Sequence, residues 1–168
     1  MIKKIKKMKK LFLLFLLAMP FIINAQEVYN TSLNPKEQLT EAIAKAKIEN
    51  KHVWVIIGAN WCKWCREFDK FAKADAKIDS ISNADYVVVK LNYDKKSESC
   101  MQALKELGFP QRFGVPVFVI LNSKGERIHT QNTGYLELGQ GVAYDSKKVV
   151  EFLTAWNVNA LLEKNYIK

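Results

Sequence analysis

Two cysteines separated by two residues, Cys62 and Cys65, follow directly on a predicted strand, and this junction constrains the fold more than any other feature of the chain. The strand is predicted for the run His52-Val53-Trp54-Val55-Ile56-Ile57, which is short, apolar and rich in β-branched and aromatic residues. Beyond the cysteines, apolar residues recur at helical spacing, at Phe68, Phe71 and Ala72. The sequence therefore predicts a strand, a cysteine pair and a helix in immediate succession.

The predicted junction places Cys62 near the N-terminus of a helix. Free amide N–H groups and the helix macrodipole favour an anion there, so the thiolate is stabilised relative to the thiol. Lys63 and Arg66 add positive charge nearby. Because a thiolate is the species that attacks a disulfide, and because two close cysteines can open and close a disulfide, the pair can exchange two electrons with another thiol.

With these residues, the chain resembles the thioredoxin superfamily, in particular its secreted, single-domain members with a second aromatic residue inside the cysteine motif. The resemblance rests on the sequence Trp61-Cys62-Lys63-Trp64-Cys65 after the strand, and on Gly114-Val115-Pro116 leading into the apolar run 117–121. It covers roughly residues 34–156. It implies an α/β, thioredoxin-like fold with a mixed central β-sheet and helices on both faces, as the order of predicted elements also indicates.

The resemblance implies an enzyme, a thiol–disulfide oxidoreductase that exchanges electrons with protein disulfides. Cys62 would be the attacking thiolate and Cys65 the resolving thiol that breaks the mixed disulfide. The expected partners are protein thiols or disulfides and a second, unidentified redox partner, with no cofactor. Two departures keep the redox direction open: Ile56 stands where many thioredoxins carry a buried acid, and Lys63-Trp64 replaces their Gly-Pro.

The resemblance also implies substrate-binding residues. In the family, the proline before this strand has a cis peptide bond and lies beside the disulfide, and the backbone of its neighbour pairs with the substrate. Pro116 and Val115 are the matching positions. Trp61 and Trp64 are expected to form an apolar docking surface, with the alternative that Trp64 only covers the helix.

Two other interpretations of the cysteine pair stay open, a static disulfide and a metal site. A gap of two residues closes only a small loop, which restrains the unfolded chain little. Zinc needs four ligands, or three with an open position. The available sulfur and nitrogen ligands are Cys62, Cys65, Cys100, His52 and His129. No metal is predicted, and the alternative function is a thioredoxin-like binding module whose cysteines hold a metal or a static disulfide.

Residues 1–25 are predicted to be a secretory signal peptide. Residues 1–10 carry six lysines and no acid, 13 apolar residues follow at 11–23, and Asn24-Ala25-Gln26 offers a cleavage site. A spanning helix needs about 20 apolar residues, and this stretch is shorter and contains Pro20. We expect no stable membrane insertion after cleavage, with an uncleaved anchor as the alternative. Export predicts a periplasmic or secreted protein, in a compartment where disulfides persist.

The net charge of +9 comes mostly from this leader. The chain has 26 basic and 17 acidic residues, and six of the basic residues precede position 11. The rest of the chain is therefore only weakly basic and shows no basic patch interleaved with aromatic residues. Nucleic-acid binding is not expected.

Residues 26–33 are expected to be a short polar lead-in, and residues 34–168 a single domain. Further helices are predicted at 34–50, around 73–82, at 99–107 and at 145–156, and further strands at 86–92, 117–121 and 126–131. Gly125 is expected in the turn of a hairpin. Cys100, the third cysteine, is expected to be a free and partly buried thiol used for packing.

Overall fold

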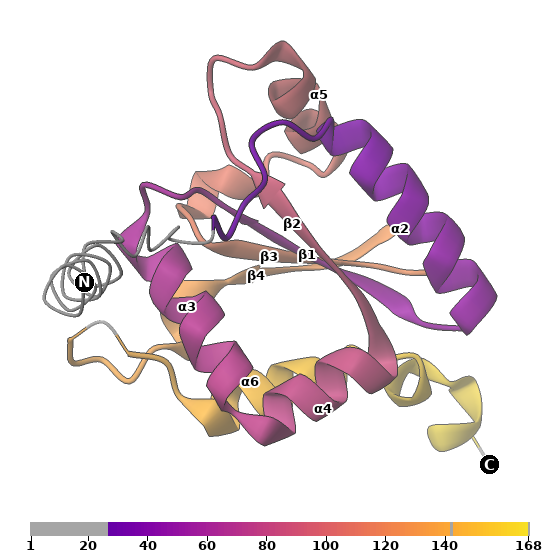
Figure 1. The fold of residues 1–168 in the computed structure, drawn as a ribbon. Helices are drawn as coiled ribbons and strands as arrows, with labels where there is room; N and C mark the ends of the chain where they lie inside the picture. The colour runs from indigo at the N-terminus through magenta and orange to yellow at the C-terminus, as the bar shows by residue number, and fades with distance from the viewer. Residues whose placement is uncertain (1–26, 142, 168) are drawn as a thin grey trace, which may run out of the picture.

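The structure is a computed structural model that describes residues 27–141 and 143–167, so the predicted signal peptide lies outside the described residues (Figure 1). Its helices are α2 (Pro35–Glu49), α3 (Lys63–Ala74), α4 (Ala76–Asp85), α5 (Glu98–Glu106) and α6 (Ser146–Ala155). Its strands are β1 (His52–Gly58), β2 (Tyr86–Asn92), β3 (Val117–Leu121) and β4 (Arg127–Asn132). These elements confirm the predicted helices and strands to within a few residues. Four short 3-10 helices, which the sequence did not predict, lie at 110–113, 133–136, 159–161 and 163–165.

Helix α2 begins and ends at the residues that its sequence predicts. The Asn34 side chain accepts a hydrogen bond of 2.9 Å from the backbone N–H of Lys36, and Pro35 takes the first helical position, where no N–H is needed. At the other end, Asn50 adopts the left-handed conformation with φ 52°, which stops the helix before β1.

The four strands form one mixed sheet in the order β2-β1-β3-β4. β1 and β2 are parallel, whereas β1 with β3 and β3 with β4 are antiparallel. Helices α2 and α5 cover one face of the sheet, and α3, α4 and α6 cover the other (Figure 1). The predicted mixed central sheet with helices on both faces is confirmed. None of the helices in the described residues is both long enough and apolar enough to cross a membrane.

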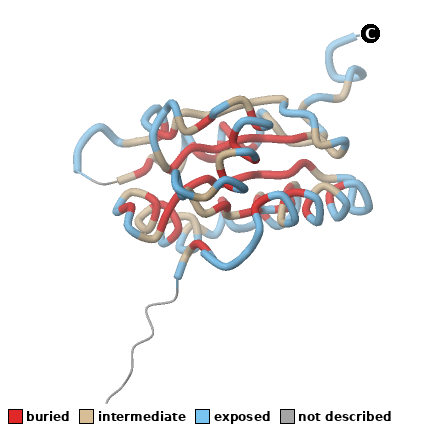
Figure 2. The backbone as a smooth tube through the Cα atoms, turned by 90° about the horizontal axis from the view of Figure 1, so that it is seen from above, coloured by how far each residue is buried: buried red, intermediate tan, exposed pale blue. Residues whose placement is uncertain are grey.

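Two apolar clusters pack against the two faces of the sheet, so β1 is buried on both sides (Figure 2). Val53, Val55 and Ile57 face α2 and α5, whereas Trp54 and Ile56 face the other three helices. Trp54 is the centre of the second cluster, and its ring meets four aromatic rings edge to face, those of Phe68, Tyr86, Phe118 and Phe152. Each such pair adds about 0.5–1.5 kcal/mol beyond the area it buries.

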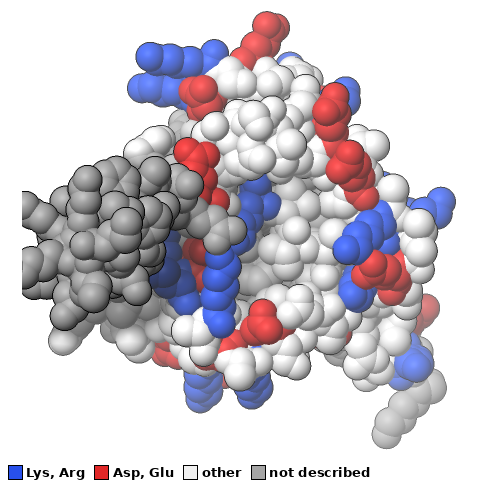
Figure 3. All heavy atoms as spheres, in the orientation of Figure 1, with Lys and Arg blue, Asp and Glu red and all other residues white. Residues whose placement is uncertain are grey.

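Strand β2 lies at an edge of the sheet. It forms part of the lining of a hollow of about 680 Å³. The hollow is bounded by α2, β1, β2, α3, α4 and the segment that precedes α2. In the space-filling view of this face, Lys and Arg are interspersed with Asp and Glu, and basic side chains lie within the central depression (Figure 3). Cys65 lines the hollow from the side of α3.

Candidate active site

The two motif cysteines occupy the start of α3 and are joined by a disulfide. Cys62 is the N-cap residue, and its Sγ accepts a hydrogen bond of 3.2 Å from the backbone N–H of Cys65. The Cα atoms are 5.3 Å apart. The residue Cys62 is 7% exposed, whereas Cys65 is fully buried, so Cys62 is the cysteine that another protein can reach.

The surroundings of Cys62 favour a negative charge on its sulfur. The backbone N–H of Cys65, in the first turn of α3, donates to it, and the N-terminal end of the helix dipole favours an anion there. Exposed Lys63 follows it directly, and Arg66 lies one turn on, with Nη1 donating a hydrogen bond of 2.5 Å to the carbonyl oxygen of Asn60. This environment stabilises a Cys62 thiolate once the disulfide is reduced.

A cis peptide bond joins Val115 to Pro116, next to the disulfide. Sγ of Cys62 lies 3.4 Å from the carbonyl oxygen of Val115. The hydroxyl of Thr133 donates a hydrogen bond of 2.6 Å to the carbonyl oxygen of Pro116, which fixes the segment that follows β4 against this loop. The expected cis bond and its position beside the disulfide are confirmed, while the role of both residues in substrate binding stays a prediction.

The two tryptophans of the motif differ in their environments. Trp61 is 70% exposed beside the disulfide. Trp64 is half-buried and packs edge to face on Tyr144, with ring centroids 5.7 Å apart. Trp61 is therefore free to contact another protein, whereas Trp64 also covers the core.

Sequence reasoning missed two further aromatic residues, in the two segments that meet at Pro116. Phe113 and Tyr135 are exposed; Phe113 precedes Val115 by two residues, and Tyr135 follows Thr133 by two. The contact between Thr133 and Pro116 brings these two segments together. An aromatic residue just before the Gly-Val-Pro sequence was the available signal for Phe113, whereas Tyr135 is placed only by the tertiary fold.

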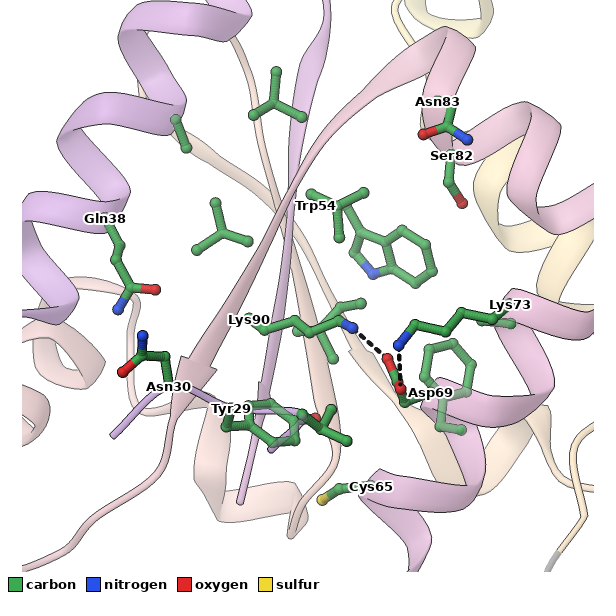
Figure 4. Close-up of a pocket in the computed structure, with 18 of the residues that line it drawn as sticks. Tyr29, Asn30, Gln38, Trp54, Cys65, Asp69, Lys73, Ser82, Asn83 and Lys90 are labelled. Carbon is green, nitrogen blue, oxygen red and sulfur yellow. Dashed lines mark hydrogen bonds and ion pairs between the residues drawn. The ribbon is translucent and has the colours of Figure 1, made fainter. Parts of the chain in front are cut away.

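A buried carboxylate also lies near the cysteines, one turn along α3 from Cys65 (Figure 4). Asp69 pairs with Lys90 of β2, and its Oδ2 lies 2.8 Å from Nζ of Lys73. Burial opposes ionisation of Asp69, but the hydrogen bonds from Lys73 and Lys90 outweigh it, so the pKa of this carboxyl lies below its usual value. Asp69 is consequently an ionised structural anchor between α3 and β2.

The remaining potential metal ligands do not gather at the disulfide. Cys100 is buried in the cluster under α2 and α5, where burial raises the pKa of its thiol, and its place confirms the expected packing role. His52 begins β1, at the end far from the cysteines, and its Nδ1 lies 2.8 Å from the carbonyl oxygen of Trp156. His129 stacks on the Trp156 ring. Residues 27–141 and 143–167 contain no cluster of three or more His, Cys, Asp or Glu suited to a metal ion.

Known proteins with similar sequences match part of this chain. Thiol:disulfide interchange protein DsbD of Salmonella typhimurium is 28% identical over 108 residues, which make up 64% of this chain and 18% of that protein. The chain thus spans less than a fifth of the length of this relative.

Solved structures agree with the fold. A disulphide isomerase from Xylella fastidiosa Temecula1 superposes with a TM-score of 0.64 at 24% identity, covering 76% of this chain and 94% of that one. The C-terminal domain of Neisseria meningitidis DsbD in its oxidised form gives a TM-score of 0.51 at 18% identity, covering 71% of this chain and 93% of that one. A model of the thioredoxin-like family matches residues 34–123, more than half of the chain. The chain therefore belongs to the thioredoxin-like family.

Proposed function

We propose that the chain is an exported thiol–disulfide oxidoreductase that exchanges electrons with protein disulfides through Cys62 and Cys65. The observation that carries the proposal is the position of Cys62, which caps α3, is the more accessible of the two sulfur residues and lies against the loop of Val115 and Pro116. The names of the relatives, a thiol:disulfide interchange protein and a disulphide isomerase, support the same class of reaction.

The proposed reaction has two exchange steps. In the reducing direction, the Cys62 thiolate attacks one sulfur of a substrate disulfide, a mixed disulfide forms, and the other substrate sulfur leaves as a thiolate that takes a proton from water. Cys65, as a thiolate, then attacks Sγ of Cys62, and the second substrate sulfur leaves. The substrate gains two electrons and the chain ends with the Cys62–Cys65 disulfide. A redox partner protein reverses these steps.

Substrate docking is proposed for the surface around the disulfide. An extended peptide would pair with the backbone of Val115 beside Pro116, while the exposed ring of Trp61 packs against its apolar side chains. The solvent-exposed part of the Trp64 ring would add to this docking surface. Phe113, which is exposed on the loop that leads to Val115, would extend it. Exposed aromatic rings are typical of protein interaction sites.

The separate roles of the two cysteines are tested by trapping. Cys65→Ser should form the mixed disulfide but release it slowly, because no neighbouring thiol remains to displace the substrate. Expressed with its leader and isolated without reductant, this variant should carry covalently bound proteins that dithiothreitol releases. Cys62→Ser should carry far fewer, and Cys100→Ser, the matched control with the third cysteine removed, should resemble the unmodified protein.

Equal trapping by Cys65→Ser and Cys62→Ser would overturn the assignment of roles. No trapping, together with a Cys62–Cys65 bond that thiol reductants leave intact, would instead support the binding module with a static disulfide. The trapped proteins would also identify the substrate class.

Export is proposed from residues 1–25, with their lysines followed by an apolar stretch. Mass spectrometry of the mature protein from the extracytoplasmic fraction should find Gln26 as the first residue. An intact leader on protein that remains with the membrane would instead indicate an uncleaved anchor.

A further inference from the structure

Tyr29 precedes the predicted domain in the sequence, yet it is one of the most buried large side chains, with 1% exposure. The side chain of Asn60 holds its backbone with two hydrogen bonds. The Tyr29 N–H donates to Oδ1 of Asn60 at 3.0 Å, and Nδ2 of Asn60 donates to the Tyr29 carbonyl oxygen at 2.8 Å. Because Asn60 is two residues before Cys62, these bonds fasten Tyr29 to the active-site loop.

The Tyr29 hydroxyl lies beside the buried sulfur of the disulfide. A Cβ atom placed on Gly58 would be 2.2 Å from Oη of Tyr29 and 2.9 Å from Sγ of Cys65, so both atoms lie against the same side of Gly58. In the close-up, the hydroxyl points toward α3, between Cys65 and Asp69 (Figure 4). A buried O–H next to a redox-active sulfur is placed to take part in the chemistry of that sulfur.

Cys65 needs such a group when the disulfide opens. Its sulfur is fully buried, and burial disfavours a thiolate. The nearby strand position 56 carries an apolar isoleucine, which is itself buried and offers no polar atom. The carboxylate of Asp69 is occupied by Lys73 and Lys90. Tyr29 is thus a neutral hydrogen-bond donor placed beside Cys65 to stabilise charge on its sulfur.

We propose that the Tyr29 hydroxyl donates a hydrogen bond to the Cys65 thiolate whenever the Cys62–Cys65 bond opens, an inference that rests on the proposed function. A substrate thiolate attacks Sγ of Cys62, the new S–S bond forms, and the bond to Cys65 breaks with its electron pair on Sγ of Cys65. Tyr29 keeps its proton and shares it in the hydrogen bond. In the reverse step, the same bond raises the fraction of Cys65 present as the attacking thiolate.

The charges around Tyr29 favour this role as a donor. Burial, then the negative charge of Asp69, then Tyr144, hold the pKa of the Tyr29 hydroxyl well above its usual value. The hydroxyl therefore stays protonated wherever thiols titrate. The charged groups that face this region are Asp69 and Lys73 from α3 and Lys90 from β2, and they neutralise one another in part.

The test measures the thiol of Cys65 directly and needs no substrate. In a chain carrying Cys62→Ala and Cys100→Ala, the ultraviolet absorbance of the remaining thiolate gives the titration midpoint of Cys65. Adding Tyr29→Phe, which keeps the ring, should raise this midpoint by about one pH unit, the size expected for one hydrogen bond to a charged group. In the enzyme with all cysteines present, Tyr29→Phe should slow the release of a mixed disulfide at neutral pH about tenfold. The pH dependence of this release rate should move upward by the same amount as the Cys65 midpoint, about one pH unit.

Tyr86→Phe is the matched control, because Tyr86 is also buried but its hydroxyl donates to the carbonyl oxygen of Leu153, away from the cysteines. This control should leave the Cys65 midpoint unchanged. Replacing Tyr29 by difluorotyrosine, a stronger donor of the same shape, should lower the midpoint, and it serves if Tyr29→Phe does not fold. An unchanged midpoint in either folded Tyr29 variant would overturn the proposal. Failure of the proposed function would appear separately, as absence of trapping by Cys65→Ser.

Discussion

Neutralising Asp69 by the substitution Asp69→Asn tests how strongly the buried ion pairs join α3 to the sheet. Asp69 is the shared partner of Lys90 from β2 and Lys73 from α3, and its side chain is 9% exposed. Asparagine has almost the same size and can accept a hydrogen bond, so the change removes charge without opening a cavity. Its effect therefore reports the electrostatic part of the contact.

The two lysines contribute unequally to the expected loss. The Lys73 side chain is 64% exposed, and an exposed pair of this kind is worth only about 0–1 kcal/mol because water screens it. The Lys90 side chain is 29% exposed and the carboxylate is buried, so this charge-assisted hydrogen bond should account for about 1.5 kcal/mol. We expect a loss of about 2 kcal/mol in the free energy of unfolding, which lowers the melting temperature by roughly 5–10 °C for a domain of this size.

The loss should depend on pH in a defined direction. The pKa of Asp69 is lower in the folded chain than its usual value of about 3.9, so the folded state favours the ionised carboxylate. This stabilisation is fully present above the unfolded pKa and disappears as the pH falls through the folded pKa. Urea unfolding at neutral pH should show the full difference in the free energy of unfolding between the unmodified protein and Asp69→Asn. In acid this difference should disappear.

The matched control is Glu67→Gln, on the same helix, because Glu67 pairs with a Lys70 side chain that is 70% exposed. That variant should change the free energy of unfolding by less than about 0.5 kcal/mol. A loss for Asp69→Asn that is the same at neutral and acid pH would refute the electrostatic reasoning, since it would show that shape or packing carries the effect.

Three further predictions concern the cysteines and the core. Thiolate absorbance of the reduced protein should show Cys62 ionising at lower pH than an ordinary cysteine with its pKa of about 8.5, and this signal should vanish in Cys62→Ser. Cys100→Ala should keep its insulin-reduction activity, because Cys100 lies across the sheet from the disulfide, and a loss as deep as that of Cys62→Ser would contradict this. Phe68→Ala should lose about 3–5 kcal/mol in urea unfolding, since its buried ring contacts Trp54, Phe118 and Tyr144, and a loss below about 1 kcal/mol would refute the assigned packing.

The elements around the disulfide could be predicted because their information is local. The run 53–57 is apolar throughout, as expected for a strand covered on both faces, and the cysteine pair and the helical pattern of α3 follow it closely. Asn34 with Pro35, and Gly125 in the hairpin, are specified by the conformations that caps and turns require. Each of these predictions needed only neighbouring residues.

The polar contacts of the site could not be predicted in this way, because their partners are far apart in the sequence. Asp69 and Lys90 are separated by 21 residues, and Tyr29 and Asn60 by 31. An acid on an amphipathic helix is usually solvated, so Asp69 alone gave no sign that it would be buried against an edge strand. Tyr29 lies in a short polar stretch without periodicity, where nothing distinguishes a core aromatic residue from an exposed one.

The geometry around Gly58 explains how a residue from outside the sheet reaches Cys65. Any side chain at this position would collide with the Tyr29 hydroxyl and with the Cys65 sulfur. Gly58 does not adopt a positive φ, so its lack of a side chain matters for space and not for backbone conformation. Position 56, two residues earlier on the same face of β1, fills its space with apolar carbon. The strand therefore supplies room at Gly58 and no polar atom at Ile56, and the polar atom beside Cys65 comes from Tyr29.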